Sequence, residues 1–328
     1  MLNVLSDSFG RQFHYLRLSV TDACNFRCAY CLPDGHVKLA GAEEHLSLEE
    51  IRRLVEAFAS IGFWKIRLTG GEPTVRRDIL EIARIVAAVP GIAQVALSTN
   101  GYRLAELAAP LRSAGVSALN VSLDSLDPER FRRITGVDRL GDVLAGLDAA
   151  FAAGFPWLKL NAVLLADLND GELATFMDWV RDRPASVRFI ELMQTGDNHG
   201  FFRRHHVSAD GLRNQLGDLG WRARARKPGD GPAVEFEHPA HRGRIGLITP
   251  YAHGFCDSCN RLRVSSRGGL RLCLFADGEA SLRPWLQADS QRDALLAEVR
   301  RLIGHKTASH SLLEGRSGNT RHFAAIGG

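Results

Sequence analysis

Long apolar runs are missing from this chain of 328 residues. A membrane-spanning helix needs about 20 consecutive apolar residues, so the sequence predicts no such span. Internal repeats and low-complexity segments are missing too, which excludes a repeat architecture. With 45% hydrophobic and 24% charged residues, the composition instead fits a water-soluble enzyme with a large core and more than one domain.

The sequence also has little excess charge. Its formal net charge of +4 is too small to indicate a nucleic-acid partner, although local arginine clusters could hold a small polyanion. Near the amino terminus, Asp7 and Arg11 do not form the cationic pattern of a signal or transit peptide. We therefore expect a reducing, cytoplasmic location and no nucleic-acid or membrane partner.

Cysteine is scarce, but the few cysteines are grouped. They form two triads near opposite ends of the chain: Cys24, Cys28 and Cys31, and then Cys256, Cys259 and Cys273. A four-iron cubane is normally held by one thiolate per iron, so a triad leaves one iron free to take a non-protein ligand. The triads are therefore candidate iron–sulfur sites at which chemistry can occur.

Disulfides and structural zinc are the two alternative uses of these cysteines. Disulfides are typical of secreted chains, and this sequence carries no secretory signal. A closed zinc site needs four ligands, and His36 or His253 could complete a triad. The C-x-x-x-C-x-x-C spacing at residues 24–31, followed by Gly-Gly-Glu-Pro at residues 70–73, resembles the radical S-adenosylmethionine (SAM) superfamily, in which SAM chelates the open iron.

Short apolar strands alternate with amphipathic helices over the first two thirds of the chain. The predicted strands are residues 15–20, 65–69, 95–99, 118–123, 158–164 and 187–192. Predicted helices include residues 48–60, 77–88 and 140–153. This order predicts an α/β fold, a partial (β/α) barrel of the radical SAM type over residues 1–205. The pattern breaks near residue 200, so a smaller α+β domain with the second cluster is expected over residues 206–328.

Polar residues follow the predicted strands. The strand ends carry the first triad and residues 70–73, 98–101, 122–124 and 191–193. In a parallel barrel the carboxyl ends of the strands meet on one face, where function is found. The sequence therefore predicts that these segments converge.

Further segments narrow the resemblance and cover the whole chain. They are residues 7–11 (DSFGR), 15–31 (YLRLSVTDACNFRCAYC), 65–73 (KIRLTGGEP), 188–193 (RFIELM), 255–263 (FCDSCNRLR) and 326–328 (IGG). Together they resemble the GTP 3′,8-cyclase family of molybdenum cofactor biosynthesis. Two departures are Ser98, where that family usually has Thr, and Phe323, where a Met often precedes the final residues.

The resemblance implies roles for particular residues. The first triad would hold the SAM-cleaving 4Fe–4S cluster, and the second triad would hold a second 4Fe–4S cluster that meets the guanine of GTP. The SAM site would be lined by Tyr30, Gly71, Ser122 and Met193, with Arg188 near the SAM carboxylate. GTP would be contacted by Arg17, Arg67, Ser98, Lys159, Arg261, Leu262 and Arg263. Catalytic roles would fall to Arg17, as a proton donor, and to Gly327 and Gly328, in a tail that inserts into the active site.

The chemistry of the arginines agrees with these roles. The planar guanidinium group of arginine donates paired hydrogen bonds to phosphate oxygens, and it suits them better than the ammonium group of lysine does. Arg261 and Arg263 alternate, so on a strand they share one face just after a cluster ligand. Arg17 and Arg67 would reach in from barrel strands and complete a cationic cavity.

The resemblance also implies the reaction and the partners. A 5′-deoxyadenosyl radical would take hydrogen from ribose carbon 3 of GTP, and the carbon radical would add to carbon 8 of the guanine. The product of this lyase would be (8S)-3′,8-cyclo-7,8-dihydroguanosine 5′-triphosphate. The implied partners are a flavodoxin- or ferredoxin-type electron donor and a downstream cyclic pyranopterin monophosphate synthase, with the enzyme a monomer or a homodimer. The alternatives are a radical SAM enzyme with an auxiliary cluster that acts on a peptide, and a non-catalytic metal-binding scaffold.

Overall fold

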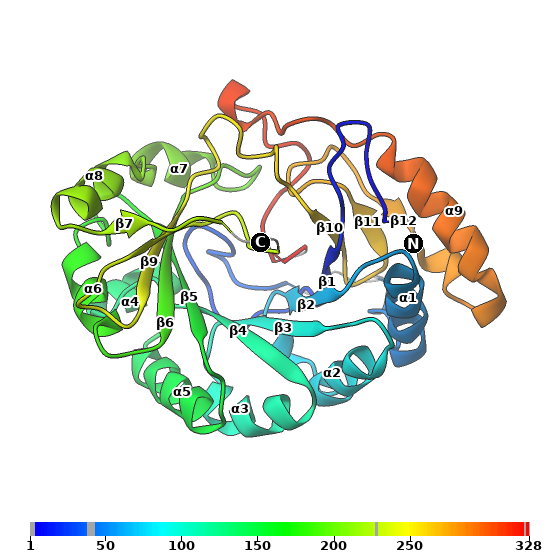
Figure 1. Cartoon of the computed structure of the whole chain (residues 1–328), viewed down its shortest axis with the longest axis horizontal. Coiled ribbons are helices and arrows are strands. Elements are labelled where there is room, and N and C mark those ends of the chain that lie inside the picture. The colour runs from blue at the N-terminus through cyan, green and yellow to red at the C-terminus, as the bar shows by residue number, and fades with distance from the viewer. Residues whose placement is uncertain (1–3, 38–42, 227–228, 325, 328) are drawn as a thin grey trace.

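The computed structural model describes residues 4–37, 43–226, 229–324 and 326–327. Its first six strands are β1 (Tyr15–Thr21), β2 (Lys65–Gly70), β3 (Gln94–Thr99), β4 (Val116–Ser122), β5 (Leu158–Leu164) and β6 (Ala185–Glu191), each parallel to the next. The helices among them are α1 (Leu48–Ser60), α2 (Ile79–Ala88), α3 (Leu104–Ser113), α4 (Pro128–Thr135), α5 (Leu140–Ala152) and α6 (Leu173–Val180). The strands form a curved sheet, and α2, α3 and α5 lie on its outer side (Figure 1). The repeated βα unit therefore builds the predicted partial barrel.

The rest of the chain adds strands to both edges of the same sheet. Its elements are α7 (His199–His205), α8 (Asp210–Asp218), β7 (Arg222–Ala223), β8 (Val234–Glu237), β9 (Arg244–Ile248), β10 (Arg261–Val264), β11 (Gly269–Arg271), β12 (Ala280–Ser281) and α9 (Arg292–Ile303). The strand order is β12-β11-β10-β1-β2-β3-β4-β5-β6-β9-β8-β7. Because β10 and β9 are parallel to β1 and β6, they extend the barrel wall at its two ends. Within the described residues, no helix has the length and apolar character needed to cross a membrane.

The predicted elements agree with the structure except at one helix start. The six predicted strands are confirmed to within a residue or two at each end. The helices predicted over 48–60 and 140–153 are confirmed as α1 and α5. The helix predicted from residue 77 is wrong at its start, because α2 begins at Ile79. Before it, Arg76 is extended (ψ 124°) and its side chain binds the Asp78 carboxylate.

Helix α1 shows how local sequence sets an element of the outer layer. Ser47 and Glu50 form a capping box, in which each side chain accepts the backbone N–H of the other residue. The helix buries Ile51, Leu54 and Phe58 completely. Burial of each such side chain stabilises the fold by about 1.5–3 kcal/mol. Apolar packing of this kind holds the barrel from outside and leaves its inner face for polar groups.

The inner face is visible in strand β2, whose six residues are all buried. Ile66 and Leu68 belong to the hydrophobic core. Since successive side chains of a strand point to opposite faces, Lys65, Arg67 and Thr69 point into the barrel. Buried charges are costly unless they are paired. The barrel interior is therefore a polar space suited to a charged ligand.

Candidate active site

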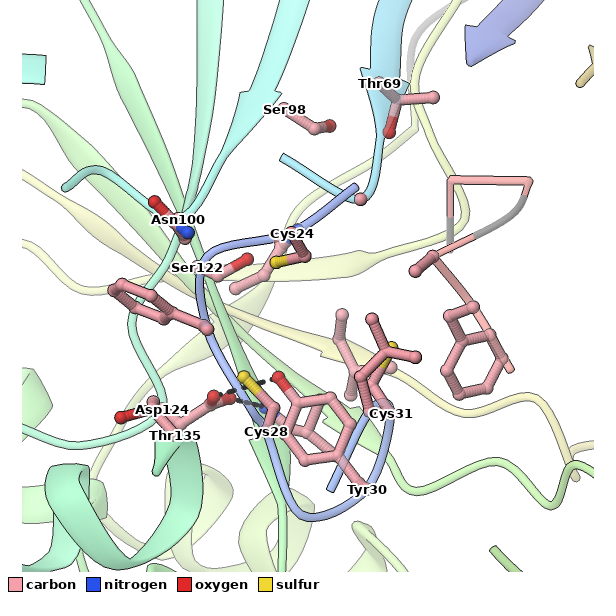
Figure 2. Close-up of a pocket in the computed structure, with 18 of the residues that line it drawn as sticks. Cys24, Cys28, Tyr30, Cys31, Thr69, Ser98, Asn100, Ser122, Asp124 and Thr135 are labelled. Atoms are coloured by element: carbon pink, nitrogen blue, oxygen red, sulfur yellow. Dashed lines mark hydrogen bonds between the residues drawn. The ribbon is translucent and has the colours of Figure 1, made fainter. Parts of the chain in front are cut away.

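The first cysteine triad lies on the loop after β1, at the carboxyl ends of the parallel strands. This loop borders the pocket drawn in Figure 2. The pocket lining includes Cys24, Cys28, Tyr30, Cys31, Gly71, Ser98, Asn100, Ser122, Asp124, Asn161, Glu191 and Met193. The predicted convergence of the strand ends is therefore confirmed. Tyr30, Gly71, Ser122 and Met193, the residues predicted to line a SAM site, line this one cavity.

Two adjacent glycines let β2 approach the cysteine loop closely. Gly70 has a φ of +143°, and a Cβ on it would lie 2.1 Å from the carbonyl oxygen of Thr21. A Cβ on Gly71 would lie 2.2 Å from the carbonyl oxygen of Ala23. The two segments are also joined by the N–H of Glu72, which donates to the Ala23 oxygen at 2.8 Å. Only residues without side chains fit here, so the glycine pair sets the position of the triad relative to the barrel.

Glu72 ties the same turn to β3. Its carboxylate accepts hydrogen bonds from the N–H and hydroxyl of Thr74, the hydroxyl of Thr99 and the N–H of Asn100. Burial raises the pKa of Glu72, although these donors favour the charged form. Glu72 is 1% exposed, so its carboxylate joins the turn after β2 to the end of β3 inside the pocket wall.

Replacing Gly71 with alanine is expected to displace the cysteine loop, because the new methyl group would meet the Ala23 carbonyl. Overpacking of this kind costs about 1–3 kcal/mol, so SAM affinity should fall by roughly tenfold or more. Iron bound at the first triad should fall as well. The check is SAM binding and iron analysis after anaerobic reconstitution. Gly141→Ala in α5 is the control, since a Cβ there meets nothing within 4 Å. Equal SAM binding by both variants would show that position 71 does not need glycine to fit against the Ala23 carbonyl.

The chemistry of the first triad fits an iron–sulfur cluster. Desolvation raises the pKa of Cys24 to about 11 and that of Cys31 to about 12. Metal ligands must be thiolates, so a positive metal centre has to offset this cost. All six cysteines of the chain are free thiols. In the described parts of the chain no three His, Cys, Asp or Glu side chains surround a single-ion position, whereas a cubane takes one thiolate at each separate corner.

Asp124 is a pocket residue to which the sequence analysis gave no role. Tyr30 Oη donates to its carboxylate at 2.9 Å, a contact drawn as a dashed line in Figure 2. The N–H of Val163 donates to the other carboxylate oxygen at 2.8 Å. Burial raises the pKa of Asp124 to about 6. The pair joins the cysteine loop to the end of β4; residues 122–124 were noted as a strand end, but nothing in the sequence pairs Asp124 with Tyr30.

Cationic side chains fill the barrel nearer the amino ends of the strands. Two rows of register partners cross β10, β1 and β2, and we call them the inner rows: Arg263, Arg17 and Arg67, and then Arg261, Tyr15 and Lys65. Arg67 Nη1 donates to the Ser98 hydroxyl at 3.1 Å. Because Ser98 also lines the pocket, the inner rows begin where the pocket ends.

The inner rows and their neighbours concentrate positive charge in a desolvated space. Burial and neighbouring cations lower the pKa of Arg17 to about 9 and that of Arg263 to about 10. The same causes lower the pKa of Lys159 in β5 to about 8 and that of Arg188 in β6 to about 10. The buried Nε atoms of Arg188 and Arg263 have no hydrogen-bond partner within the described chain. An anion would stabilise this set of groups, so the geometry indicates an anionic ligand.

The side chains of two predicted site residues, Leu262 and Arg188, do not line the predicted site directly. Leu262 is 0% exposed and packs in the hydrophobic core, on the face of β10 opposite Arg261 and Arg263. Only its backbone is available to the barrel interior. Arg188 reaches the pocket indirectly, because its Nη2 donates at 2.8 Å to Asn161, which lines the pocket.

The second triad lies on the loops around β10 and β11, beside the inner rows. The N–H of Cys259 donates to the Cys256 carbonyl at 3.0 Å, and the N–H of Phe275 lies 3.5 Å from the Cys273 sulfur. Burial acts to raise the pKa of Cys259, but Arg261 and then Lys306 outweigh it and lower this pKa to about 7. Basic groups therefore support the thiolate of Cys259, whereas burial disfavours the thiolates of Cys24 and Cys31 in the first triad.

Two basic residues that the sequence analysis missed hold the backbone around the second triad. The ammonium group of Lys306, which is 5% exposed, donates to the Leu272 carbonyl next to Cys273. Arg11 donates to the Cys256 carbonyl at 3.3 Å. Both are far from the triad along the chain. Arg11 ends the DSFGR segment quoted above, which implied no role for it, and no motif marks Lys306.

The carboxyl-terminal tail enters the barrel. Figure 1 shows the described part of the tail on the inner side of the curved strands. Arg17 Nε and Nη2 donate to the Gly327 carbonyl at 3.1 and 2.7 Å. Ile326 and Phe323 pack with Leu274 and Phe275, so Phe323 takes part in docking the tail. The predicted tail residue Gly328 lies outside the described residues.

The known proteins to which this chain is similar indicate the same kind of site as this geometry. A family model described as the radical SAM superfamily matches residues 18–180, and one described as Molybdenum Cofactor Synthesis C matches residues 185–312. A GTP 3′,8-cyclase of Stenotrophomonas maltophilia is 56% identical over 100% of both chains. One of Synechococcus elongatus is 53% identical over 99% of both chains. The chain belongs to the GTP 3′,8-cyclase family.

Solved structures share the fold of this family member. The crystal structure of Streptococcus suis SuiB bound to S-adenosylmethionine aligns with a TM-score of 0.62 at 13% identity, over 88% of this chain and 68% of SuiB. HydG, a maturase of the FeFe-hydrogenase, aligns with a TM-score of 0.50 at 15% identity, over 62% of this chain and 48% of HydG. At these identities the likeness shows the radical SAM fold alone.

Family membership settles the class of the protein. It is a radical SAM enzyme of molybdenum cofactor biosynthesis, and its superfamily implies SAM and a 4Fe–4S cluster. This favours the cyclase prediction over the peptide-modifying and scaffold alternatives. The domain boundary near residue 206 stays a prediction.

Proposed function

We propose that this protein converts GTP to (8S)-3′,8-cyclo-7,8-dihydroguanosine 5′-triphosphate. The observation that carries the proposal is the set of buried cations between the two triads. Arg67 contacts Ser98 at the edge of the first pocket, and Arg263 lies within electrostatic reach of Cys259 and Cys273. A triphosphate would offset a large part of the positive charge of such a set. The nucleotide would then extend from the first triad towards the second.

The proposed cofactor site uses the pocket at the strand ends. Cys24, Cys28 and Cys31 would hold the first cluster, and Tyr30, Gly71, Ser122 and Met193 would surround SAM. Arg188 would act near the SAM carboxylate, with its side chain oriented by Asn161. When bound, SAM and the cluster supply the radical that takes hydrogen from ribose carbon 3 of GTP.

We also propose a second 4Fe–4S cluster on Cys256, Cys259 and Cys273. Three thiolates leave an open iron for the guanine, as in the first triad. The charges of Arg261 and Lys306 support this, because they favour the thiolate of Cys259. Arg11 and Lys306 would keep the ligand loops in place through the backbone.

The substrate residues of the proposal bind and orient GTP. Side-chain contacts would come from Arg17, Arg67, Ser98, Lys159, Arg261 and Arg263, and a backbone contact from Leu262. A radical reacts with most C–H bonds, so the chain must hold the ribose at near van der Waals range and exclude water. Arg17 is the proposed proton donor to the cyclised product, and burial supports this by lowering its pKa to about 9.

The remaining partners follow from the proposed reaction. A reductant of flavodoxin or ferredoxin type would supply the electrons, and a cyclic pyranopterin monophosphate synthase would use the product. A reducing, cytoplasmic setting is consistent with the six free thiols.

Single alanine substitutions at Arg261 and Arg263 test the substrate site. Each charge-assisted hydrogen bond should contribute about 1.5–3 kcal/mol, so GTP affinity should fall by roughly ten- to a hundredfold. SAM affinity and iron content should stay nearly unchanged. Anaerobic GTP and SAM titrations measure both. Arg301→Ala in α9, an exposed arginine paired with Glu298, is the matched control; GTP affinity unaltered in both test variants would mean that the substrate site is elsewhere.

A further inference from the structure

One member of the inner rows is not a cation. Tyr15 stands in register between Arg261 and Lys65, and it is 5% exposed. Its phenol oxygen accepts a hydrogen bond from Arg67 Nε, and the ammonium group of Lys65 lies 4.8 Å from its ring centre. The sequence analysis gave this residue no role.

The phenol fixes the direction of the Arg67 guanidinium. Arg67 donates from Nε to Tyr15 and from Nη1 to Ser98 at 3.1 Å. A guanidinium has five N–H groups in a rigid plane, so these two contacts set where the others point. The remaining N–H groups have no acceptor among the described residues and are available to a ligand. Tyr15 thereby orients a proposed triphosphate contact.

Charged groups surround the phenol from several strands. The cations are Arg17 of β1, Lys65 and Arg67 of β2, Arg188 of β6, and Arg261 and Arg263 of β10. Acidic groups act on these cations: Asp230 acts on Lys65, and Glu235 acts on Lys159 and Arg188. Burial acts to raise the pKa of Tyr15, but Arg67, Arg17 and Lys65 outweigh burial and lower this pKa to about 7. Near neutral pH, a phenolate at Tyr15 therefore offsets part of the positive charge of the rows.

We propose that Tyr15 is a positioning residue of the GTP site, because it orients Arg67. In the protein without GTP, its phenolate also offsets part of the positive charge of the inner rows, and the triphosphate takes over that role when GTP binds. The inference rests on the proposed function. Once triphosphate oxygens offset most of this positive charge and lie beside the phenolate, the like charges repel and the phenolate takes a proton from solvent. The neutral phenol still accepts the Arg67 hydrogen bond, and its new O–H can donate to a phosphate oxygen. GTP binding is thus coupled to proton uptake at one side chain.

The direction of the pH dependence follows from this coupling. A complex that holds more protons than its free components weakens as pH rises. GTP affinity should therefore fall between about pH 7 and 8.5, above the lowered pKa of Tyr15. Lys159, whose pKa is lowered to about 8 by burial and then by Arg188, contributes uptake of the same sign. Only the difference between the wild type and a Tyr15 variant isolates the phenol.

Calorimetric titration of reconstituted protein with GTP, at pH 7.5 in two buffers of different ionisation enthalpy, measures this difference. Tyr15→Phe should take up about 0.75 proton fewer per GTP than the wild type, and its affinity should depend less steeply on pH. Tyr102→Phe is the control, because Tyr102 packs against Phe26 and Arg139, away from the inner rows. Equal proton uptake by the wild type and Tyr15→Phe would overturn the proposal.

A second measurement covers the case in which the phenylalanine variant does not fold. Incorporation of 3-fluorotyrosine makes the phenol more acidic without removing its oxygen. The pH profile of GTP affinity should then move to lower pH, whereas a purely structural ring would leave it unmoved. Failure of the wild type to bind GTP at all would overturn the proposed function instead, so the two failures are distinguishable.

Discussion

Replacing Cys24 with alanine is expected to halve the iron bound by the reconstituted protein and to abolish SAM cleavage. Two cubanes on two triads correspond to about eight irons per chain, and loss of the first cluster leaves about four. Without the first cluster there is no open iron beside the pocket to which SAM can bind. Iron analysis and measurement of 5′-deoxyadenosine after anaerobic reconstitution check both parts.

The matched variant is Cys256→Ala. It should also lose about half of the iron, yet it should retain slow SAM cleavage that is uncoupled from GTP, because the first triad is intact. Both variants remove one free thiol of the same kind. Stoichiometric zinc without labile iron in the wild type would refute the cluster assignment for both triads.

Replacing Gly327 with valine is expected to lower formation of the cyclised product by about a hundredfold, because small displacements near a reacting group can cost that much. Gly327 has a φ of +63°, and a Cβ on it would lie 2.1 Å from Thr69 Cγ2. A side chain would therefore push the carbonyl away from Arg17, which binds it at 2.7 Å. The fold, both clusters and SAM binding should be unchanged, as should those of a variant that lacks the last two residues. Quantification of the product by mass spectrometry is the measurement.

Two comparisons make the tail result specific. Gly278→Val is a control, since a Cβ there meets nothing within 4 Å. Addition of a peptide that copies the terminal Ile-Gly-Gly segment should partly restore the truncated variant. A truncated protein that cyclises GTP at the full rate would show that the tail is inert.

The sequence predicted the parts of this molecule that depend on local pattern. The alternation of β2, with Ile66 and Leu68 between charged or polar residues, predicts a strand, and Ser47 is a residue type that favours a helix start, as found at α1. The cysteine spacing and the Gly-Gly-Glu-Pro turn carry the resemblance from which the SAM pocket was predicted. These signals need only a few neighbouring residues.

Other parts of the site depend on register between distant strands. Tyr15, two residues before Arg17, becomes interpretable only when Lys65 and Arg261 are known to flank it. The contact of Lys306 with Leu272 likewise joins segments that are far apart in sequence. For Leu262, strand alternation alone could have indicated that its side chain faces away from Arg261 and Arg263.

The most direct test of the central claim is product analysis after anaerobic incubation of the reconstituted protein with SAM, a reductant and GTP. We expect (8S)-3′,8-cyclo-7,8-dihydroguanosine 5′-triphosphate together with 5′-deoxyadenosine, and neither compound from the Cys24→Ala variant. Cleavage of SAM while all GTP is recovered unchanged would show that GTP is not the substrate.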